Sequence, residues 1–211
     1  YPFRAGISHT WRTHCVELAE SLALEPGTTD IVLDIGANDG TFLAECQSRG
    51  AKVLGVDPCP VGDLPMLGER WSSALVPGII QMHGRPDTIT ATNVFGHVDD
   101  AEDFLRGIAQ LLPPHGQAAI ECPHIFPLLE NTAFDTIYHE HLSYWSLRPL
   151  ELLAQRVGLK VVEEIDYHDD GYRFDWRIVW RHLETGKLYT ARDAGCSCPS
   201  RNILVSHCSW T

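Results

Sequence analysis

The stretch Val32-Leu-Asp-Ile-Gly-Ala-Asn-Asp-Gly40 decides the fold expected for this chain. An apolar run enters a turn that contains Gly36 and Gly40, and a helical pattern over residues 41–48 follows it. Small residues in such a strand–turn–helix unit let the backbone approach a ligand closely. Asp57 lies about 20 residues further on, after a second apolar run, where a carboxylate can accept hydrogen bonds from both hydroxyls of a ribose. The stretch therefore predicts a ligand site at the end of a strand.

Strand and helix patterns alternate along most of the chain. Helices are expected over residues 10–24, 41–48, 101–112 and 147–157, and strands over residues 31–35, 52–56, 88–94, 118–121, 160–165 and 173–180. The last two strands can pair as a hairpin across the polar residues 168–171. This order predicts an α/β fold of Rossmann-like type, with a mostly parallel sheet, an antiparallel closing hairpin and helices on both faces. Residues 58–78 are rich in Gly and Pro, and no helix is predicted there.

The composition indicates one soluble domain with short extensions. The 211 residues carry a formal net charge of −12, which disfavours binding to nucleic acid. No stretch approaches the roughly 18 consecutive apolar residues of a membrane helix, and no secretory signal is present, so no membrane partner is expected. The cysteines are odd in number and scattered, which favours a reducing, cytoplasmic location. Four of them lie within or beside apolar segments and are expected to act as small hydrophobic residues, namely Cys15, Cys46, Cys59 and Cys122.

The charges beside the glycine turn favour a ligand with a positive group. The spacing is not that of a dinucleotide-binding turn, and Asp34 and Asp39 would repel a pyrophosphate. S-adenosylmethionine (SAM) combines a ribose with a positively charged group and fits better. The alternative is a tight strand–helix turn that has a capping Asp and binds nothing.

A second informative stretch is Asp135-Thr-Ile-Tyr-His-Glu-His-Leu-Ser-Tyr-Trp145. His139 and His141 are two residues apart, whereas a zinc-binding helix needs histidines four apart, so no metal site is predicted. A histidine titrates near neutrality and can act as a base, with a carboxylate or a phenol beside it. The alternative is a buried loop whose polar groups satisfy the backbone.

Both stretches resemble known methyltransferases. Asp34-Ile-Gly-Ala-Asn-Asp-Gly40 is similar to the acidic-x-Gly-x-x-x-Gly turn of class I SAM-dependent methyltransferases, and Asp57 falls at their ribose-binding acid. The run from Asn131 to Tyr144 resembles a signature of the sugar C-methyltransferases, which act at C3 of dTDP-linked 4-keto-deoxysugars. Further pieces agree in order over roughly residues 1–180, namely Tyr1–Arg4, Asn93–His97, Asp99–Gly107, Glu121–His124 and Leu147–Leu159.

This resemblance implies a role for each matching residue. His141 would be the general base with Tyr138 and Glu140 beside it, and His97 would be a second active-site histidine. Tyr138 or His97 would donate to the oxygen of an enolate, and Glu140 would orient or charge-balance a histidine. SAM would be held by the residues that match the family's cofactor site, namely Asp34, Gly36, Asn38, Gly40, Asp57 and Asn93.

The expected function is therefore SAM-dependent methylation of a carbon next to a ketone, with a nucleotide-linked 4-keto-deoxysugar as the acceptor. The alternatives are O- or N-methylation of another small metabolite, and a truncated SAM-binding domain without activity. We expect a helical lead-in over residues 1–28, the SAM-binding domain over residues 29–183 and an extension over residues 184–211. The sequence does not indicate an oligomeric state.

The chain also departs from the sugar C-methyltransferases. It starts after the position of their N-terminal zinc-binding domain, and their C-terminal domain is absent or reduced to about the last thirty residues. Asp169-Asp-Gly-Tyr-Arg173 replaces a Gly-Gly-Ser-Leu-Arg-like turn, and its two carboxylates would hinder an anionic sugar nucleotide. Cys196, Cys198, His207 and Cys208 are of metal-binding types, but their irregular spacing favours a solvated tail. The segment between the second and third strands is short and leaves the adenine contacts unassigned.

Overall fold

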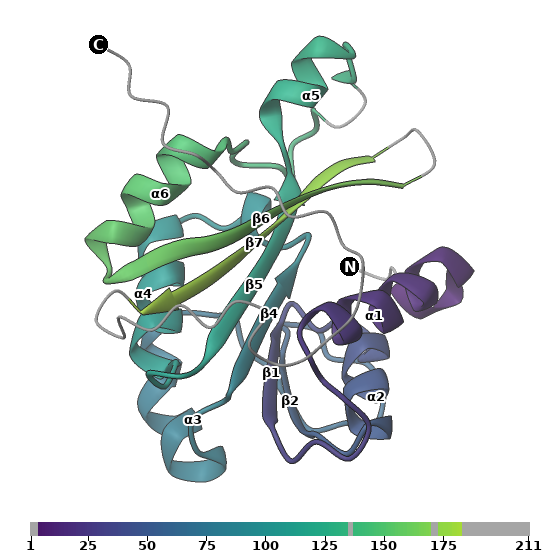
Figure 1. Ribbon diagram of the computed structural model, residues 1–211, viewed down its shortest axis with the longest axis vertical. Helices are drawn as coiled ribbons and strands as arrows, with labels where there is room; N and C mark the ends of the chain where they lie inside the picture. Colours follow the sequence, from purple (N-terminus) through teal and green to yellow (C-terminus); the bar gives the residue numbers. More distant parts are fainter. Residues whose placement is uncertain (1–3, 135–136, 170–172, 183–211) are drawn as a thin grey trace.

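A computed structural model describes residues 4–134, 137–169 and 173–182. Its centre is a seven-stranded sheet in the order β3-β2-β1-β4-β5-β7-β6 (Figure 1). The strands are β1 (Ile31–Ile35), β2 (Lys52–Val56), β3 (Met66–Leu67), β4 (Thr88–Thr92), β5 (Gln117–Pro123), β6 (Leu159–Asp169) and β7 (Arg173–His182). The first five are parallel, and β7 pairs antiparallel with both β5 and β6. The predicted parallel sheet and closing hairpin are confirmed.

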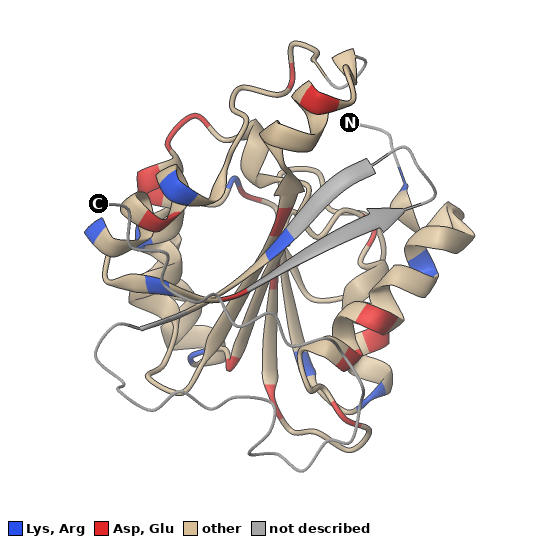
Figure 2. Cartoon of the chain, turned by 45° about the horizontal axis from the view of Figure 1, so that its top comes forward, with Lys and Arg blue, Asp and Glu red and all other residues tan. Residues whose placement is uncertain are grey.

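Helices cover both faces of the sheet (Figure 1). They are α1 (His9–Ser21), α2 (Thr41–Ser48), α3 (Val76–His83), α4 (Ala101–Leu111), α5 (Ile125–Glu130) and α6 (Leu147–Arg156), with 3₁₀ turns η1 (Ala5–Ile7), η2 (Ser73–Leu75) and η3 (Phe95–His97). One apolar core lies between the sheet and α1 and α2, and the other lies between the sheet and α3, α4 and α6. The five parallel strands contain three charged residues, Asp34, Lys52 and Glu121, and many of the other charged residues drawn in Figure 2 lie on the helices and loops.

Alternation along β1 divides its side chains between these two cores. Val32 packs toward α1 and α2, whereas Leu33 and Ile35 pack toward α3 and α4. Asp34 therefore lies on the α1 side, because neighbouring residues of a strand point to opposite faces. By the same alternation Glu121 in β5 shares the α1 side with Ala119. Two buried carboxyl groups thus face the same helix pair.

Local signals place the helix ends. The Ser8 hydroxyl caps α1 by accepting from the Trp11 amide at 3.2 Å, and the Asp100 carboxylate caps α4 by accepting from the Asp103 amide at 2.8 Å. The helix predicted over residues 10–24 ends at Ser21, before its expected end.

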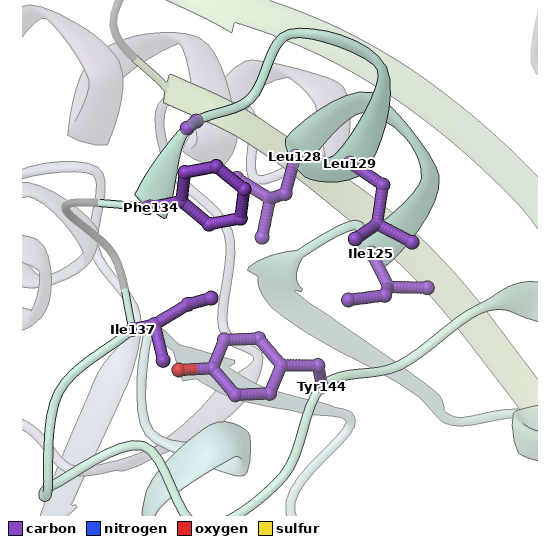
Figure 3. A pocket seen from close by; sticks show the side chains of 7 residues that line it. Ile125, Leu128, Leu129, Phe134, Ile137 and Tyr144 are labelled. Atoms are coloured by element: carbon purple, nitrogen blue, oxygen red, sulfur yellow. The ribbon is translucent and has the colours of Figure 1, made fainter.

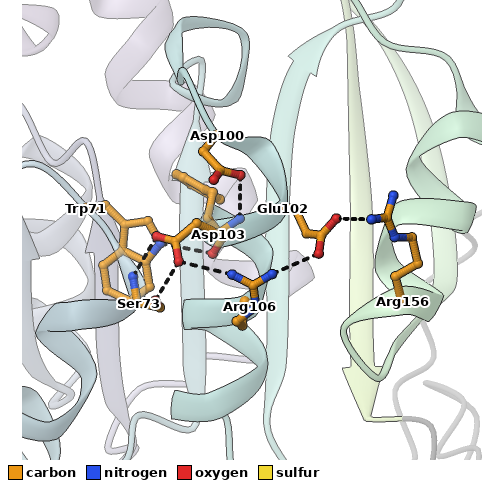
Figure 4. A network of polar contacts seen from close by, with 8 residues as sticks. Trp71, Ser73, Asp100, Glu102, Asp103, Arg106 and Arg156 are labelled. Carbon is orange, nitrogen blue, oxygen red and sulfur yellow. Dashed lines mark hydrogen bonds and ion pairs between the residues drawn. The ribbon is translucent and has the colours of Figure 1, made fainter.

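The segment between β2 and β4 differs most from the expectation. No helix was predicted over residues 58–78, but α3 starts at Val76, and the two-residue strand β3 pairs with β2. Polar contacts fix this segment to α4 (Figure 4): the Trp71 indole donates to the Phe104 carbonyl at 3.1 Å, and the Ser73 amide donates to Asp103 Oδ2 at 3.0 Å. On the other side of α4, Glu102 pairs with Arg106 at 2.8 Å and with Arg156 of α6 at 2.5 Å. Apart from the Glu102–Arg106 pair, which spans one helical turn, these contacts join residues distant in sequence, so no local pattern predicts them.

The cysteines are free thiols in the part of the chain that the structure describes, but the expectation of four hydrophobic cysteines is only partly right. Cys15, Cys46 and Cys122 are buried, whereas Cys59 is exposed because the loop after β2 lies at the surface. Burial raises the pKa of the Cys46 thiol to about 12, and the nearby Asp34 raises it further. Cys46 is therefore an unreactive part of the core. The Cys and His residues of the C-terminal segment lie outside the described residues.

Candidate active site

The glycine turn lies between the end of β2 and the residues that follow β4. Gly36 has a φ of +77°, and its amide donates to the Val56 carbonyl at 2.7 Å. A Cβ at this position would lie 3.0 Å from Val94 Cβ, closer than side chains normally approach. Gly40 has a φ of +73° and forms the N-cap of α2. Both positions thus need glycine for their backbone conformation, and Gly36 also needs it for space.

Asp57 lies directly beside this turn. Its Oδ2 accepts from the Asn38 amide at 3.0 Å, and its Oδ1 accepts from the Cys59 amide at 2.8 Å. Asn38 itself has a φ of +51°, in the left-handed region where Asn is tolerated. Each carboxylate oxygen has a second lone pair, so Asp57 retains the capacity to accept from hydroxyls. The turn and the acid that were predicted to act together do lie together.

Asp34 is buried beneath the turn. Its Oδ1 accepts a hydrogen bond from the Thr90 hydroxyl at 2.7 Å. Burial raises the pKa of Asp34 to about 7, against the hydrogen bond from Thr90, which lowers it. A positive group above the turn would favour the ionised form of this carboxyl. The preference of this site for a cationic ligand over a phosphate stays a prediction from the sequence.

The N-terminal lead-in covers part of the turn. The Gly6 amide donates to Asp39 Oδ2 at 2.9 Å, and Arg12 Nη1 donates to the Gly6 carbonyl at 2.6 Å. Asp39 Oδ1 also accepts from the Thr41 hydroxyl at 2.7 Å. Asp39 thus ties η1 to the start of α2, a structural role that the sequence analysis did not assign.

The loop after β4 carries the next predicted residues. Asn93 has a φ of +55°, and its amide donates to the Glu121 carbonyl of β5 at 2.9 Å. The 3₁₀ turn η3 follows, and its Gly96 carbonyl accepts from the amides of Leu142 and Ser143 at 2.8 and 3.2 Å. These bonds attach the histidine-rich segment to the carboxyl end of β4.

Four aromatic rings meet where the two segments join. The Tyr138 hydroxyl lies 3.0 Å from His141 Nε2, and the ring centroids of His97 and His141 are 4.7 Å apart. The Tyr144 ring meets His141 edge-on at 5.7 Å. His97 Nδ1 lies 2.7 Å from the Glu140 carbonyl and must donate to it, which leaves Nε2 as the acceptor in the neutral ring. Glu140 enters this cluster through its backbone, whereas a side-chain role was predicted.

The loop of residues 93–97 joins the glycine turn to the aromatic cluster. Val94 lies against Gly36 on one side, and a Cβ on Gly96 would lie 3.7 Å from His141 Cδ2 on the other. The sequence-predicted residues thus gather at the carboxyl ends of β1, β2 and β4. This edge is where ligands bind in open α/β sheets.

The sequence analysis missed a buried polar network next to this edge. His14 Nε2 of α1 lies 2.7 Å from Glu121 Oε2, and Arg177 Nε donates to Glu121 Oε1 at 2.6 Å. Arg177 Nη1 also donates to the Ser21 hydroxyl at 2.6 Å. Burial alone would raise the pKa of Glu121, but the hydrogen bond from His14 and the charge of Arg177 hold it below its usual range. The available signal was a lone Glu in the apolar strand of residues 117–123.

Comparison with known proteins identifies the family. The profile of a methyltransferase domain matches residues 8–164. The chain belongs to this methyltransferase family. Its methyl donor is SAM, as the sequence predicted. A second profile, of a domain of unknown function, matches residues 154–201.

Individual relatives of this methyltransferase act on different atoms. The C-methyltransferase NovU of Streptomyces niveus is 33% identical over 159 residues, which cover 68% of this chain and 36% of NovU. The ubiquinone biosynthesis O-methyltransferase of Escherichia coli O7:K1 is 34% identical over 95 residues, which cover 40% of this chain and 39% of that enzyme. The chain thus spans less than two fifths of the length of either relative.

Solved structures show the same fold. The PH0226 protein of Pyrococcus horikoshii has a TM-score of 0.61 at 14% identity, covering 83% of this chain and 92% of that one. A second structure is the 1,6-didemethyltoxoflavin-N1-methyltransferase of Burkholderia thailandensis with bound 1,6-didemethyltoxoflavin and S-adenosylhomocysteine. Its TM-score is 0.59 at 15% identity, and the match covers 81% of this chain and 77% of that one. These likenesses confirm the Rossmann-like methyltransferase fold.

Within residues 4–134, 137–169 and 173–182, no group of three or more His, Cys, Asp or Glu side chains is arranged to hold a metal ion. No helix in the described part of the chain has the length and hydropathy to cross a membrane.

Proposed function

We propose that this methyltransferase transfers a methyl group to a carbon atom next to a carbonyl group. The observation that carries the proposal is the contact between the Tyr138 hydroxyl and His141 Nε2 at 3.0 Å, with the His97 ring beside it. A carbon acceptor has no lone pair, so a base must first remove a proton, and the carbonyl oxygen must be stabilised as it gains charge. The relation to the C-methyltransferase NovU supports the same chemistry.

The residues around the glycine turn would hold SAM. Gly36 and Gly40 hold the turn in a left-handed backbone conformation, Asp57 would accept from the ribose hydroxyls, and Asp34 would compensate a positive charge. Asn38 and Asn93 would line the two sides of the methionine part. When bound, SAM supplies an electrophilic methyl group on its sulfonium.

His141 would take the proton from the acceptor carbon. A base held in place typically accelerates such a step by about 10²–10⁴-fold. Because the Tyr138 hydroxyl lies 3.0 Å from His141 Nε2, an acceptor that brings its carbon to this nitrogen also brings its carbonyl oxygen near Tyr138. Tyr138 or His97 would then donate to the enolate oxygen, a contribution of about 2.7–4 kcal/mol for one donor. Glu140 would orient His97 through its carbonyl oxygen.

The acceptor that we propose is a nucleotide-linked 4-keto-deoxysugar, methylated at C3. Its support is the match between residues 131–144 and the signature of the sugar C-methyltransferases. We also propose the division into a lead-in over residues 1–28, the SAM-binding domain over residues 29–183 and an extension over residues 184–211. The buried thiols of Cys15, Cys46 and Cys122 fit a cytoplasmic location.

Deuterium exchange tests the role of His141. In D₂O without SAM, the protein should exchange the hydrogen at C3 of a dTDP-linked 4-keto-6-deoxyhexose, read by NMR. His141→Asn should lower the exchange rate by about 10²-fold or more while SAM binding, read by calorimetry, persists. His139→Asn is the matched control, because His139 is exposed and only two residues away. Exchange that is unchanged in His141→Asn would remove His141 from the base role, and methylation without any exchange would favour O- or N-methylation.

A further inference from the structure

A small apolar cavity lies beside the aromatic cluster. It is formed by α5 and the chain that follows, and its side chains converge from three directions in Figure 3. The cavity has a volume of about 30 Å³, which gives room for one small group. Its walls include Ile125, Leu128, Leu129, Phe134, Ile137 and Tyr144.

The rim of this cavity is unusually apolar for a surface. Leu129, Phe134 and Ile137 are 56%, 63% and 59% exposed, and only Leu128 is buried. A cluster of large apolar side chains at a surface often marks a place where a ligand or another part of a protein binds. None of the lining side chains carries a charge, so the cavity does not suit a phosphate or a carboxylate.

The cavity and the proposed base share a wall. Tyr144 lines the cavity and also meets the His141 ring at 5.7 Å. Ile137 lines it too, and the next residue is Tyr138, whose hydroxyl contacts His141 Nε2. The Tyr144 ring is therefore common to the cavity and to the surroundings of the proposed base.

We infer that this cavity receives a methyl-sized apolar substituent of the acceptor and makes the enzyme selective for acceptors that carry one. The inference rests on the proposed function. In a 4-keto-6-deoxyhexose the methyl group on C5 is three bonds from C3, so one pose can place C3 at His141 and the methyl group in the cavity. Leu129, Ala133 and Ile137 thereby become specificity-determining residues.

The test compares two probes that differ only in this methyl group: a dTDP-linked 4-keto-6-deoxyhexose and the corresponding dTDP-linked 4-ketopentose. Calorimetry gives the dissociation constant of each, and NMR in D₂O without SAM gives the efficiency of hydrogen exchange at C3. One methyl group in an apolar pocket is worth about 10–200-fold. We expect a preference of about 10-fold or more for the hexose in the wild-type protein.

Two variants assign that preference to the cavity. Ala133→Leu fills the cavity and should bring the preference close to one, with the pentose still bound and exchanged. Leu129→Asp places a charge on the rim and should act in the same direction. Leu152→Asp is the matched control, since Leu152 is an exposed leucine of α6 outside the cavity, and should keep the wild-type preference.

The outcomes separate the two proposals. Equal binding and equal exchange of both probes would overturn the inference and leave the proposed function standing. A binding preference without exchange of either probe would uphold the cavity and overturn the base role. Failure to bind either probe would overturn both, and a preference that survives in both Ala133→Leu and Leu129→Asp would overturn the cavity as its source.

Discussion

The substitution Asp34→Asn offers the sharpest test of the electrostatics beneath the glycine turn. Asp34 is 3% exposed and its carboxyl accepts from the Thr90 hydroxyl at 2.7 Å. Burial raises its pKa from 3.8 to about 7, and the charges of Asp57 and Glu121 act in the same direction. Asn keeps the size of the side chain but cannot titrate. The comparison therefore isolates the free energy of ionising one buried carboxyl.

The sign of the pH dependence follows from which state holds the proton. Between pH 4 and 7 the folded protein keeps the Asp34 proton while the unfolded chain has lost it, so the free energy of unfolding falls as the pH rises. At about 1.36 kcal/mol per pKa unit, the wild-type protein should lose about 2–3 kcal/mol from this group between pH 5 and pH 8. Asp34→Asn should not lose it.

Urea unfolding of both proteins at several pH values between 5 and 8 measures this effect. The quantity to compare is the difference in the free energy of unfolding between Asp34→Asn and wild type, and how this difference changes with pH. A constant cost of burying the amide therefore cancels. Asp103→Asn is the control: hydrogen bonds from Ser73 lower the pKa of Asp103, so its difference from wild type should stay constant over this range and vanish only in stronger acid. A pH-independent difference for Asp34→Asn would refute a raised pKa.

Two further substitutions test the packing around the site. Arg177→Met removes one partner of the buried Glu121 carboxylate and should lower the free energy of unfolding by about 3–5 kcal/mol in urea melts; a loss below about 1 kcal/mol would mean that the pair contributes little. Gly36→Ala forces a side chain against Val94 and should lower SAM affinity, read by calorimetry, and stability by more than Gly158→Ala, whose φ of +86° is similar but whose surroundings are open. Equal losses for the two glycine variants would show that backbone strain, and not the contact with Val94, sets the cost.

Local patterns in the sequence were enough for most of the scaffold. β1 over Ile31–Ile35, α2 over Thr41–Ser48 and β2 over Lys52–Val56 match their predicted bounds, because apolar period, turn glycines and caps act within a few residues. The short strand β3 and the helices α3 and α5 escaped prediction. β3 has two residues and exists through its pairing with β2, and α5 has six residues with a proline inside. Such elements depend on their neighbours rather than on their own sequence.

The candidate site was also predicted only in part. The glycine turn and Asp57 were predicted to serve one ligand, because an acid about 20 residues after such a turn is placed to bind a ribose, and the structure does bring the two together. Their assignment to SAM and the assignment of His141 as a base remain predictions. Asp39 was interpreted from its charge, with a capping Asp as the alternative, but its bond to the Gly6 amide also ties the lead-in to the turn.

The sequence by itself determined most of the strands and helices and the fold class, since these follow from local periodicity and from the alternation of the two kinds of element. Only the tertiary structure decided which of those groups touch. His14 meets Glu121 across 107 residues of chain, and His97 meets the Glu140 carbonyl across 43. Burial favours the neutral form of both Asp34 and Glu121, but their pKa values shift in opposite directions: that of Asp34 is raised, whereas the hydrogen bond from His14 and the charge of Arg177 lower that of Glu121.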